Sequence, residues 1–308
     1  GMLCSEREMM ISDEHDGIID LDQDAPVGES FAAWAGLDDP VIEIAITPNR
    51  ADCLGVRGVA RDLAAAGYGT LKPLDTSAHE GSFDSPVTWR LDLDGAEHLA
   101  PLITGIAFRG VTNGPSPDWM ARRLNAIGQR PISALVDITN YVMFDLGRPL
   151  HAYDIDKIHG SELIVRQADG GEPFTALNEK TYKMEAGMIT IGDAEGVDDL
   201  AGVMGGERTG VSDGTTGMFL EIAVFDPISV ATTGRKLNLN SDARYRFERG
   251  LDSESPVWAA GHIARMVTDI CGGEASVPVT MGPGVDWKRS IFLGLSLIHI
   301  SEPTRHLL

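Results

Sequence analysis

The segment at residues 131–154, PISALVDITNYVMFDLGRPLHAYD, constrains the fold most strongly, because it predicts a long helix that has to be buried. Its apolar residues recur at the spacing of one helix face, namely Leu135, Ile138, Val142 and Leu146. We expect the helix to end at Gly147, since glycine commonly follows a helix and Pro149 cannot continue one. The apolar face therefore anchors this helix in a hydrophobic core.

Three polar residues interrupt this segment, and an apolar core would exclude them. Thr139 and Asn140 lie within the helix, where such side chains usually bond a carbonyl of the preceding turn or face water. His151 follows the stiff Gly147–Pro149 turn, and its ordinary role would be a hydrogen bond to a nearby carboxylate such as Asp154. Periodicity alone thus predicts a core helix with polar exceptions.

The remaining patterns mix helices and strands in no regular order. Alternating or apolar runs predict strands at residues 41–47, 101–111, 162–168, 188–192, 218–225 and 274–281. Helical spacing and start signals predict helices at 56–66, 116–128 and 253–271, and another that begins at Asp226-Pro227. Asp52 and Ser116 are expected to cap two of these helices. Because strands and helices do not alternate as βαβ units, the pattern favours an α+β fold.

Shifts in composition predict how the chain is divided. Residues 1–69 are expected to form a small N-terminal α/β unit, and residues 70–85 form a polar linker rich in Pro, Gly and Ser. A larger mixed-sheet domain follows at residues 86–283, and residues 284–294 would begin a further module. The end of the chain continues no earlier pattern, so residues 295–308 are interpreted as a non-native tail.

The charge balance and the cysteines limit the classes of function. Lys and Arg total 25 against 46 Asp and Glu, which gives a net charge of −21. A general polyanion-binding surface needs a basic footprint, so only a small local contact with nucleic acid is compatible with this chain. Cys4, Cys53 and Cys271 have no metal-ligand spacing and are too sparse for a disulfide framework, which favours a reducing, cytoplasmic setting. We expect no metal site and no membrane span.

Common catalytic motifs are missing, since the sequence has no P-loop, no HExxH and no GxSxG. The glycine-rich run at residues 201–210, AGVMGGERTG, is either an ordinary tight loop or a place where backbone N–H groups approach a ligand. Glu221 lies in an apolar strand pattern, on the face of Phe219 and Ala223. It either faces solvent or accepts a hydrogen bond inside a pocket, where a carboxylate needs a partner.

The segment SDARYRFERG at residues 241–250 gathers three arginines in an acidic chain. Arg244, Arg246 and Arg249 stand close to Glu248 in the sequence, so a salt-bridged corner is one interpretation. The other interpretation is a contact with phosphate. The sequence leaves both open.

Six segments resemble, in the same order, the β subunit of bacterial phenylalanyl-tRNA synthetase. They are GMLCSEREM, VIEIAITPNRADCLGVRGVARDLA, RPISALVDITNYVMFDLGRPLHAYD, LAGVMGG, LEIAVFDP and SDARYRFERG. The resemblance covers about residues 1–290 and implies part of the small N-terminal module, from just after an inserted OB-type tRNA-binding domain, followed by the editing module. The OB domain, the downstream modules and the α subunit would lie outside this central segment.

Matched motif by motif, the resemblance implies a pocket. His151, Thr139 and Asn140 would bind the terminal ribose or position the attacking water. The other implied pocket residues are Arg130, Ala201, Gly202, Glu221, Ser241 and Ala243. The family often has threonine where Ser241 stands, and the VDDL at residues 197–200 is less apolar than the resemblance implies.

The implied activity is editing, the hydrolysis of tyrosine wrongly attached to tRNA(Phe). Glu221 would accept the phenolic hydroxyl and the Gly202 N–H would donate to it. The implied partners are the tyrosine-bearing 3′ end of tRNA(Phe) and the α subunit in an (αβ)2 assembly. ATP and Mg²⁺ would bind the parent ligase at sites outside this chain, which itself needs no cofactor. The alternatives are a structural or tRNA-binding piece without activity of its own, and a free-standing editing homologue that acts on another ligand.

Overall fold

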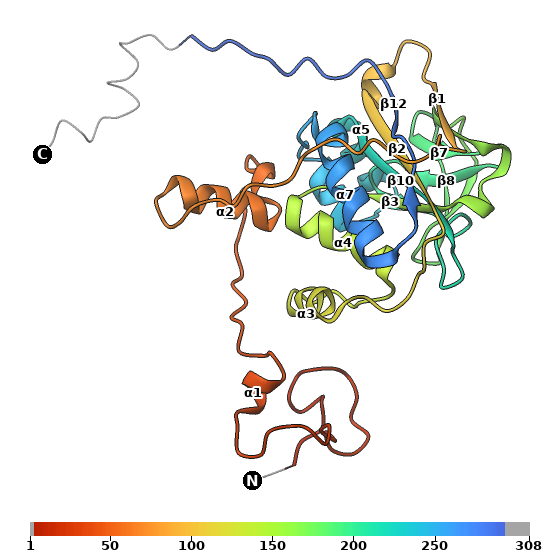
Figure 1. Ribbon diagram of the computed structural model, residues 1–308. Coiled ribbons are helices and arrows are strands. Elements are labelled where there is room, and N and C mark those ends of the chain that lie inside the picture. Colours follow the sequence, from red (N-terminus) through yellow and green to blue (C-terminus); the bar gives the residue numbers. More distant parts are fainter. Residues whose placement is uncertain (1–2, 293–308) are drawn as a thin grey trace, which may run out of the picture. The chain divides into compact units, whose positions relative to one another are not determined.

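The computed structural model describes residues 3–292 (Figure 1). Contacts divide the chain into two compact units, Gly1–Ile44 and Ala45–Leu308. The described residues of the first unit contain one short helix, α1 (Phe31–Trp34), and no strand. Residues 284–292 carry no helix or strand, and the predicted tail at 295–308 lies outside the described residues.

The predicted strand at residues 41–47 is wrong. This segment is extended but pairs with no other strand among residues 3–292. Val41, Ile42 and Ile44 are 62%, 76% and 51% exposed. Alternation of apolar and polar residues produces a strand only where a second strand accepts its backbone hydrogen bonds, and the described part of this unit offers none.

The second unit contains, in its described residues, six α-helices and four short 3₁₀ turns. The α-helices are α2 (Val56–Ala65), α3 (Asp118–Ala126), α4 (Ala134–Leu146), α5 (Pro227–Lys236), α6 (Asp242–Phe247) and α7 (Ser255–Cys271). The 3₁₀ turns are η1 (Ala51–Cys53), η2 (Glu97–Leu99), η3 (Ile155–Lys157) and η4 (His159–Ser161). All the helices that were predicted for this unit are present, with ends that differ by a few residues.

The strands of the second unit form two larger sheets and a hairpin. The first sheet has the order β1 (Thr88–Asp92), β4 (Glu162–Gln167), β7 (Ile189–Gly192), β8 (Val197–Leu200), β9 (Met204–Gly205). The second has the order β11 (Glu274–Ala275), β2 (Leu102–Arg109), β10 (Gly217–Val224), β3 (His151–Asp154), and β12 (Val279–Met281) also pairs with β2. The hairpin joins β5 (Pro173–Thr175) and β6 (Thr181–Lys183).

The sheets are mixed, and the predicted α+β class is confirmed. The pair β1–β4 is parallel, whereas the other pairs among the described strands are antiparallel. Helices α4 and α7 pack on the second sheet, and helices do not alternate with the strands along the chain. Such segregation distinguishes an α+β domain from a doubly wound α/β domain.

Strand β10 separates two hydrophobic cores. Phe219 and Ala223 pack on one side with apolar residues of the first sheet. Leu220 and Ile222 pack on the other side with apolar residues of α4 and α7, which cover this face of the second sheet (Figure 1). Because successive residues of a strand point to opposite faces, one buried strand contributes to both cores.

Two predicted helix boundaries are confirmed by their geometry. Helix α4 ends at Gly147, whose φ of 70° is the left-handed conformation that glycine adopts without strain. Helix α5 begins after Asp226, whose carboxylate accepts a hydrogen bond of 2.7 Å from the Ser229 N–H. Both signals are local in the sequence, so the prediction needed no information on distant residues.

Two predicted caps are wrong because the side chains have other partners. Ser116 donates to the Asp137 carboxylate at 2.5 Å, and α3 starts after Pro117 instead. The Asp52 carboxylate binds Arg50 and Arg61, and helix α2 starts after Gly55 without a side-chain cap. A charged partner satisfies a carboxylate more strongly than a backbone N–H does.

The predicted linker at residues 70–85 has no helix or strand, but it is held against the domain. Arg265 donates to the carbonyl oxygens of Asp75 and Ser77 at 2.9 and 3.1 Å. The unit boundary at residues 44 and 45 falls inside the predicted module 1–69, and Leu54 accepts a hydrogen bond of 3.1 Å from Arg246. Residues 45–69 thus belong with the larger unit.

Candidate functional site

Glu221 is a buried carboxyl group at the centre of the second sheet. It lies on β10, on the face of Phe219 and Ala223, and only 5% of the residue is exposed. The solvent-facing interpretation of this residue is therefore wrong, because both faces of the strand are covered. Burial raises the pKa of Glu221 to about 7, while a hydrogen bond from Tyr153 and the charge of Arg148 oppose the shift.

His151 is the cross-strand partner of Glu221. The two residues face each other in the antiparallel β10–β3 pair, although 70 positions separate them in the sequence. Gly205 of the first sheet leaves room for the imidazole, since a Cβ there would come within 2.0 Å of His151 Cε1. The structure thus brings together two of the predicted site residues, at the place where the two sheets meet.

Burial keeps His151 neutral at physiological pH. Its pKa is lowered to about 4, because the charged imidazolium would lose its hydration. The predicted partner Asp154 instead accepts a hydrogen bond of 2.6 Å from Thr215. The nearest carboxylate is that of Asp199, whose Oδ2 lies 3.8 Å from His151 Nε2, too far for a hydrogen bond.

Tyr153 and Asp199 complete this polar group, and the prediction of site residues did not include them. The Tyr153 hydroxyl donates to Glu221 Oε2 at 3.1 Å, and its ring meets the His151 ring edge-on at 4.4 Å between centroids. Tyr153 stands two residues after His151, so strand alternation is the signal that could have found it. Asp199 could have been recognised from the two adjacent acids in VDDL at residues 197–200, where an apolar segment was expected.

Arg148 supplies the opposite charge and was also missed. It is 2% exposed and its Nη1 donates to Ser255 Oγ at 2.9 Å, while Nη2 donates to the Ala223 carbonyl. Its guanidinium carbon also lies 5.3 Å from the centre of the Phe247 ring. Burial lowers the Arg148 pKa to about 10, so the side chain stays charged at neutral pH and attracts the Glu221 carboxylate.

The predicted residues Ala201, Gly202, Ser241 and Ala243 lie in the loop before β9 and at the start of α6. Gly202 has a φ of 70°, and a Cβ there would come within 3.0 Å of Phe225 and Val230. Ser241 caps α6 by accepting from the Arg244 N–H at 3.0 Å, and it donates to the Val203 carbonyl. Ala201 is buried and Ala243 packs against the same core as Glu221's neighbours. Gly202 is therefore closely packed against residues of α5 and α6.

The other three predicted residues lie on or before α4. Thr139 Oγ1 donates to the Val136 carbonyl at 2.7 Å, which is the ordinary interaction for a threonine within a helix. Asn140 is half-buried on the same helix, and Arg130 is exposed in the turn before it. Helix α4 packs its apolar side on the face of the second sheet opposite to Glu221. Thr139 and Asn140 therefore belong to a helix that covers the face of the sheet opposite to the one that carries Glu221.

The arginines of residues 241–250 have acidic partners. Arg244 and Arg249 bind Glu248 at 3.0 and 2.7 Å, and Arg246 lies 3.4 Å from Asp242. Arg244 and Arg246 are buried and also donate to backbone carbonyls. The salt-bridged interpretation of this segment is therefore the one that the contacts support.

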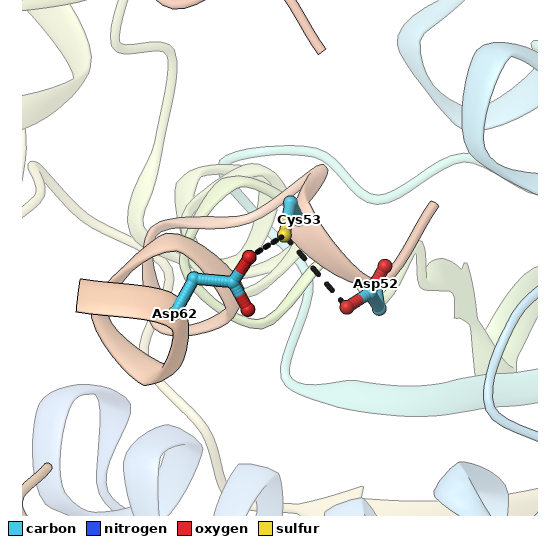
Figure 2. A group of neighbouring side chains, drawn as sticks. All are labelled: Asp52, Cys53 and Asp62. Atoms are coloured by element: carbon cyan, nitrogen blue, oxygen red, sulfur yellow. Dashed lines mark hydrogen bonds between the residues drawn. The ribbon is translucent and has the colours of Figure 1, made fainter. Parts of the chain in front are cut away.

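One group of side chains outside this site has donor atoms that could hold a cation. Figure 2 shows Asp52, Cys53 and Asp62, whose oxygen and sulfur atoms lie within 4.8 Å of one another. Arg50 Nη2 already lies 2.9 Å from Asp52, 2.5 Å from Asp62 and 2.9 Å from Cys53 Sγ. A guanidinium therefore takes the place of a metal ion here, and the residues do not fit a metal centre.

Two surface hollows lie away from the Glu221 group. One, of about 670 Å³, is lined by residues that include Trp119, His262 and Arg265. The other, of about 480 Å³, is lined by residues that include Phe83, Arg109 and Asp156. Neither hollow contains a predicted site residue. No helix within residues 3–292 is long and apolar enough to cross a bilayer.

Comparison with known proteins identifies the family. A model of the B3/4 domain matches residues 99–272. The chain is 54% identical over 285 residues to the phenylalanine–tRNA ligase β subunit of Brucella abortus (strain 2308), covering 92% of this chain and 35% of that protein. It is 53% identical over 290 residues to the corresponding subunit of Cereibacter sphaeroides, covering 94% and 36%. The chain thus spans about a third of the length of these relatives.

A solved structure gives a weaker match. It is an N-terminal fragment of the phenylalanyl-tRNA synthetase β subunit from Pyrococcus horikoshii, with 17% identity, a TM-score of 0.34, and coverage of 68% of this chain and 69% of that one. On the domain match and the sequence identities, the chain belongs to the B3/4 domain family, in the form found in phenylalanine–tRNA ligase β subunits.

Proposed function

We propose that this chain is the editing module of a phenylalanine–tRNA ligase and hydrolyses tyrosine from mischarged tRNA(Phe). The observation that carries the proposal is the buried Glu221, a carboxyl group that accepts a hydrogen bond from Tyr153 and is attracted by the charge of Arg148, where the two sheets meet. A buried carboxyl is costly for stability, so its presence calls for a role in binding or chemistry.

The chemistry of Glu221 suits the discrimination of tyrosine from phenylalanine. The two amino acids differ by one hydroxyl, and an apolar pocket separates them poorly. A buried acceptor rejects the analogue that lacks the hydroxyl, because the acceptor is then left unpaired, and such discrimination reaches about four to five powers of ten. We assign acceptance of the phenolic proton to Glu221 and donation of an N–H to Gly202.

The hydrolytic step needs water directed at an activated ester. His151 is neutral and its Nε2 has no hydrogen-bond partner within the described residues, so this nitrogen is available to orient a water or a ribose hydroxyl. Positioning contributes strongly to such reactions, and acid–base help adds about two to four powers of ten. We assign Thr139, Asn140 and Arg130 to contacts with the 3′ end of the tRNA.

The parent ligase supplies the remaining partners in this proposal. We expect an α subunit that performs aminoacylation, an (αβ)2 assembly, and ATP and Mg²⁺ bound outside this chain, in the cytoplasm. A net charge of −21 agrees with a module that takes only the 3′ end of the tRNA. The phosphate contacts would then come from other parts of the ligase.

Deacylation of Tyr-tRNA(Phe) tests the proposal. Release of tyrosine would be measured with this chain and with the full ligase, each as wild type and as Glu221→Ala. We expect the substitution to lower the rate about ten- to a hundredfold, which is the effect of losing a hydrogen bond to a charged group. Lys288→Ala, an exposed residue in the segment without helix or strand, serves as the matched control. Equal rates for Glu221→Ala and wild type in the full ligase would exclude the role of Glu221.

The alternative function, a structural or tRNA-binding piece without activity of its own, gives a different result. The chain alone would then release no tyrosine above buffer, while the full ligase would do so in a Glu221-dependent manner. The one-third coverage of the relatives is the observation that keeps this alternative open to test.

A further inference from the structure

Helix α3 has an outer face rich in arginine that the proposed function does not use. Trp119, Arg122 and Arg123 recur at the i, i+3, i+4 spacing of one helix face, and all three are exposed. Met120 and Leu124, on the other side of the helix, are 0% and 1% exposed and belong to the core. The buried side is enough to hold α3 on the domain, so the outer face requires an explanation of its own.

The arginines of this region have no acidic partner. In the described part of the chain, no carboxylate forms an ion pair with Arg122, Arg123 or Arg130. The sequence has no acid at residues 119–136. The arginines of residues 241–250, in contrast, are paired with acids. Three unpaired guanidinium groups therefore give this region a local positive charge in a chain of net charge −21.

Two aromatic side chains hold Arg123 in position. Its Nη1 donates to the Tyr141 hydroxyl at 2.7 Å, and its guanidinium carbon lies 5.4 Å from the centre of the Trp119 ring. The rings of Trp119 and Tyr141 meet edge-on, at 5.2 Å between centroids. Both partners of Arg123 are uncharged, so its charge stays available to an anion. A guanidinium held in this way loses less conformational entropy when it binds a phosphate.

Trp119 also lines the larger surface hollow, of about 670 Å³, together with Met266 of α7. Asp75, Asp269 and Arg265 line the same hollow. Asp75 lies 3.2 Å from Arg265, so that cation is already paired. Asp269 would repel a phosphate, whereas a nucleobase is uncharged, can stack on an indole ring and can donate an amino N–H to a carboxylate. The hollow therefore suits a base, and the arginines beside it suit phosphates.

We propose that Trp119, Arg122, Arg123 and Arg130 form an α3 surface that binds single-stranded RNA. The arginines contact phosphates, and one base enters the hollow and stacks on Trp119. Proteins hold single strands by this combination of cations with an aromatic platform. The identity of the strand as the 3′ end of tRNA rests on the proposed function, whereas the binding of single-stranded RNA does not. Only the few phosphates of such an end are bound here, which agrees with the acidity of the chain as a whole.

The α3 surface is connected to the proposed site by helix α4. Helix α3 packs against α4 (Figure 1), and α4 continues through the turn at Gly147 to His151 on β3. Strand β3 is the outer strand in the order of its sheet, so His151 lies at the edge of that sheet. An RNA end held on α3 would therefore be led along α4 toward His151.

Binding of a short fluorescent single-stranded RNA that ends in CCA tests the phosphate contacts. The dissociation constant of this chain would be measured by fluorescence anisotropy over a range of salt concentrations. Each phosphate contact on a single strand contributes about 0.7 to the slope of log affinity against log salt. Arg122→Ala/Arg123→Ala should therefore weaken binding and reduce this slope by about 1.4, for two contacts. Arg235→Ala, at an exposed position of α5, is the matched control and should change neither quantity.

The same probe tests the stacked base. Trp119→Ala should weaken binding about tenfold and leave the salt slope unchanged, because stacking releases no counterions. Trp119→Phe keeps an aromatic face and should retain most of the affinity. A duplex RNA of the same sequence should bind this chain more weakly than the single strand, since its bases are already stacked on one another.

Three results would overturn the inference. Equal affinities and salt slopes for the wild type and Arg122→Ala/Arg123→Ala would exclude the phosphate contacts. Equal binding of the single strand and the duplex, with no effect of Trp119→Ala, would exclude the stacked base. Loss of the α subunit from the full ligase in the arginine variant, with RNA binding unchanged, would assign the α3 surface to a protein partner.

Deacylation by the full ligase separates this inference from the proposed function. Arg122→Ala/Arg123→Ala should raise the KM for Tyr-tRNA(Phe) by a larger factor than it lowers kcat, because the lost contacts bind the RNA and not the ester. If deacylation depends on Glu221 but no RNA binds through the α3 surface, this inference fails and the proposed function stands. If RNA binds as expected but Glu221→Ala has no effect on deacylation, the proposed role of Glu221 fails and the α3 surface stands.

Discussion

The two faces of strand β10 are both buried, but one is stabilised by apolar packing and the other also carries buried polar groups. On the helix side, Leu220 and Ile222 pack within a cluster of buried apolar residues. On the other side, Glu221 accepts a hydrogen bond from Tyr153 and is attracted by the charge of the buried Arg148. The helix side is what a stable fold requires, and the polar side costs stability. The comparison shows that one strand can combine an apolar face with a face that carries a buried polar group.

The largest expected loss of stability follows from substitution of Arg148, the cation on the polar side of β10. Arg148→Leu should lower the free energy of unfolding by about 3–5 kcal/mol at pH 8, because the Ser255 hydroxyl and the Ala223 carbonyl each lose a buried donor and Glu221 loses a nearby positive charge. Urea unfolding followed by circular dichroism measures this loss. The double variant Arg148→Leu/Glu221→Leu should recover much of the stability, and a double variant as unstable as the single one would contradict the coupling.

On the helix side, removal of packing alone should cost nearly as much. Leu220→Ala should lower the free energy of unfolding by about 2–5 kcal/mol, because Leu220 is 0% exposed and its removal leaves a cavity. The same urea experiment applies. This loss should be independent of pH, and a pH-dependent loss would show that the two faces are not separate.

The third prediction concerns stability against pH on the polar side. The pKa of Glu221 is about 7 in the folded chain, above its unfolded value, so the folded state binds the proton more tightly. Stability from this group is present below about pH 4.5 and is lost as the pH rises toward 7. His151, with a folded pKa of about 4, acts in the opposite direction between about pH 4 and 6.5.

Substitution of Glu221 or of His151 removes one of these two opposing effects of pH on stability and leaves the other. From pH 4.5 to 7, the free energy of unfolding of Glu221→Gln should fall less steeply than that of the wild type. The two slopes should differ by up to about 1.4 kcal/mol per pH unit. His151→Asn should fall more steeply than the wild type over the acidic part of that range. Urea titrations at several pH values provide the measurement, and parallel curves for all three chains would contradict both assignments.

The smallest expected effect lies at Thr139. Its hydroxyl donates to Val136 in its own helix, so Thr139→Ser, which keeps that hydroxyl, should change the free energy of unfolding by at most about 0.5 kcal/mol. Thr139→Ala should have a similarly small effect on stability, while it lowers Tyr-tRNA(Phe) deacylation if the residue contacts the tRNA end. A large stability change in both variants would assign Thr139 to the core instead.

Local signals in the sequence predicted much of the fold. The spacing of α4, its end at Gly147 and the start of α5 at Asp226 depend on residues within a turn of one another. The strand at 41–47 failed because a strand needs a distant partner. The Asp52 cap failed because Arg61, nine positions later, competes for the carboxylate.

The polar site was only partly predictable for the same reason. Glu221 stood out as an acid in an apolar run, and His151 as a polar residue in a stiff turn. Their pairing depends on the register of β10 and β3, which the sequence does not reveal locally. Asp199 and Arg148 join the site from a different sheet and from a turn, so they are recognised only once the chain is folded.

The start and the end of the larger domain are joined by backbone hydrogen bonds. Ser82 N–H donates to the Ala275 carbonyl at 2.9 Å, and Val277 N–H donates to the Phe83 carbonyl at 2.8 Å. Nearly two hundred residues of chain therefore leave and return at one place. A domain whose entry and exit lie side by side can be inserted into another chain, or exchanged between chains, without pulling its host apart. This geometry suits the domain to a mosaic protein, in which each module folds around its own core.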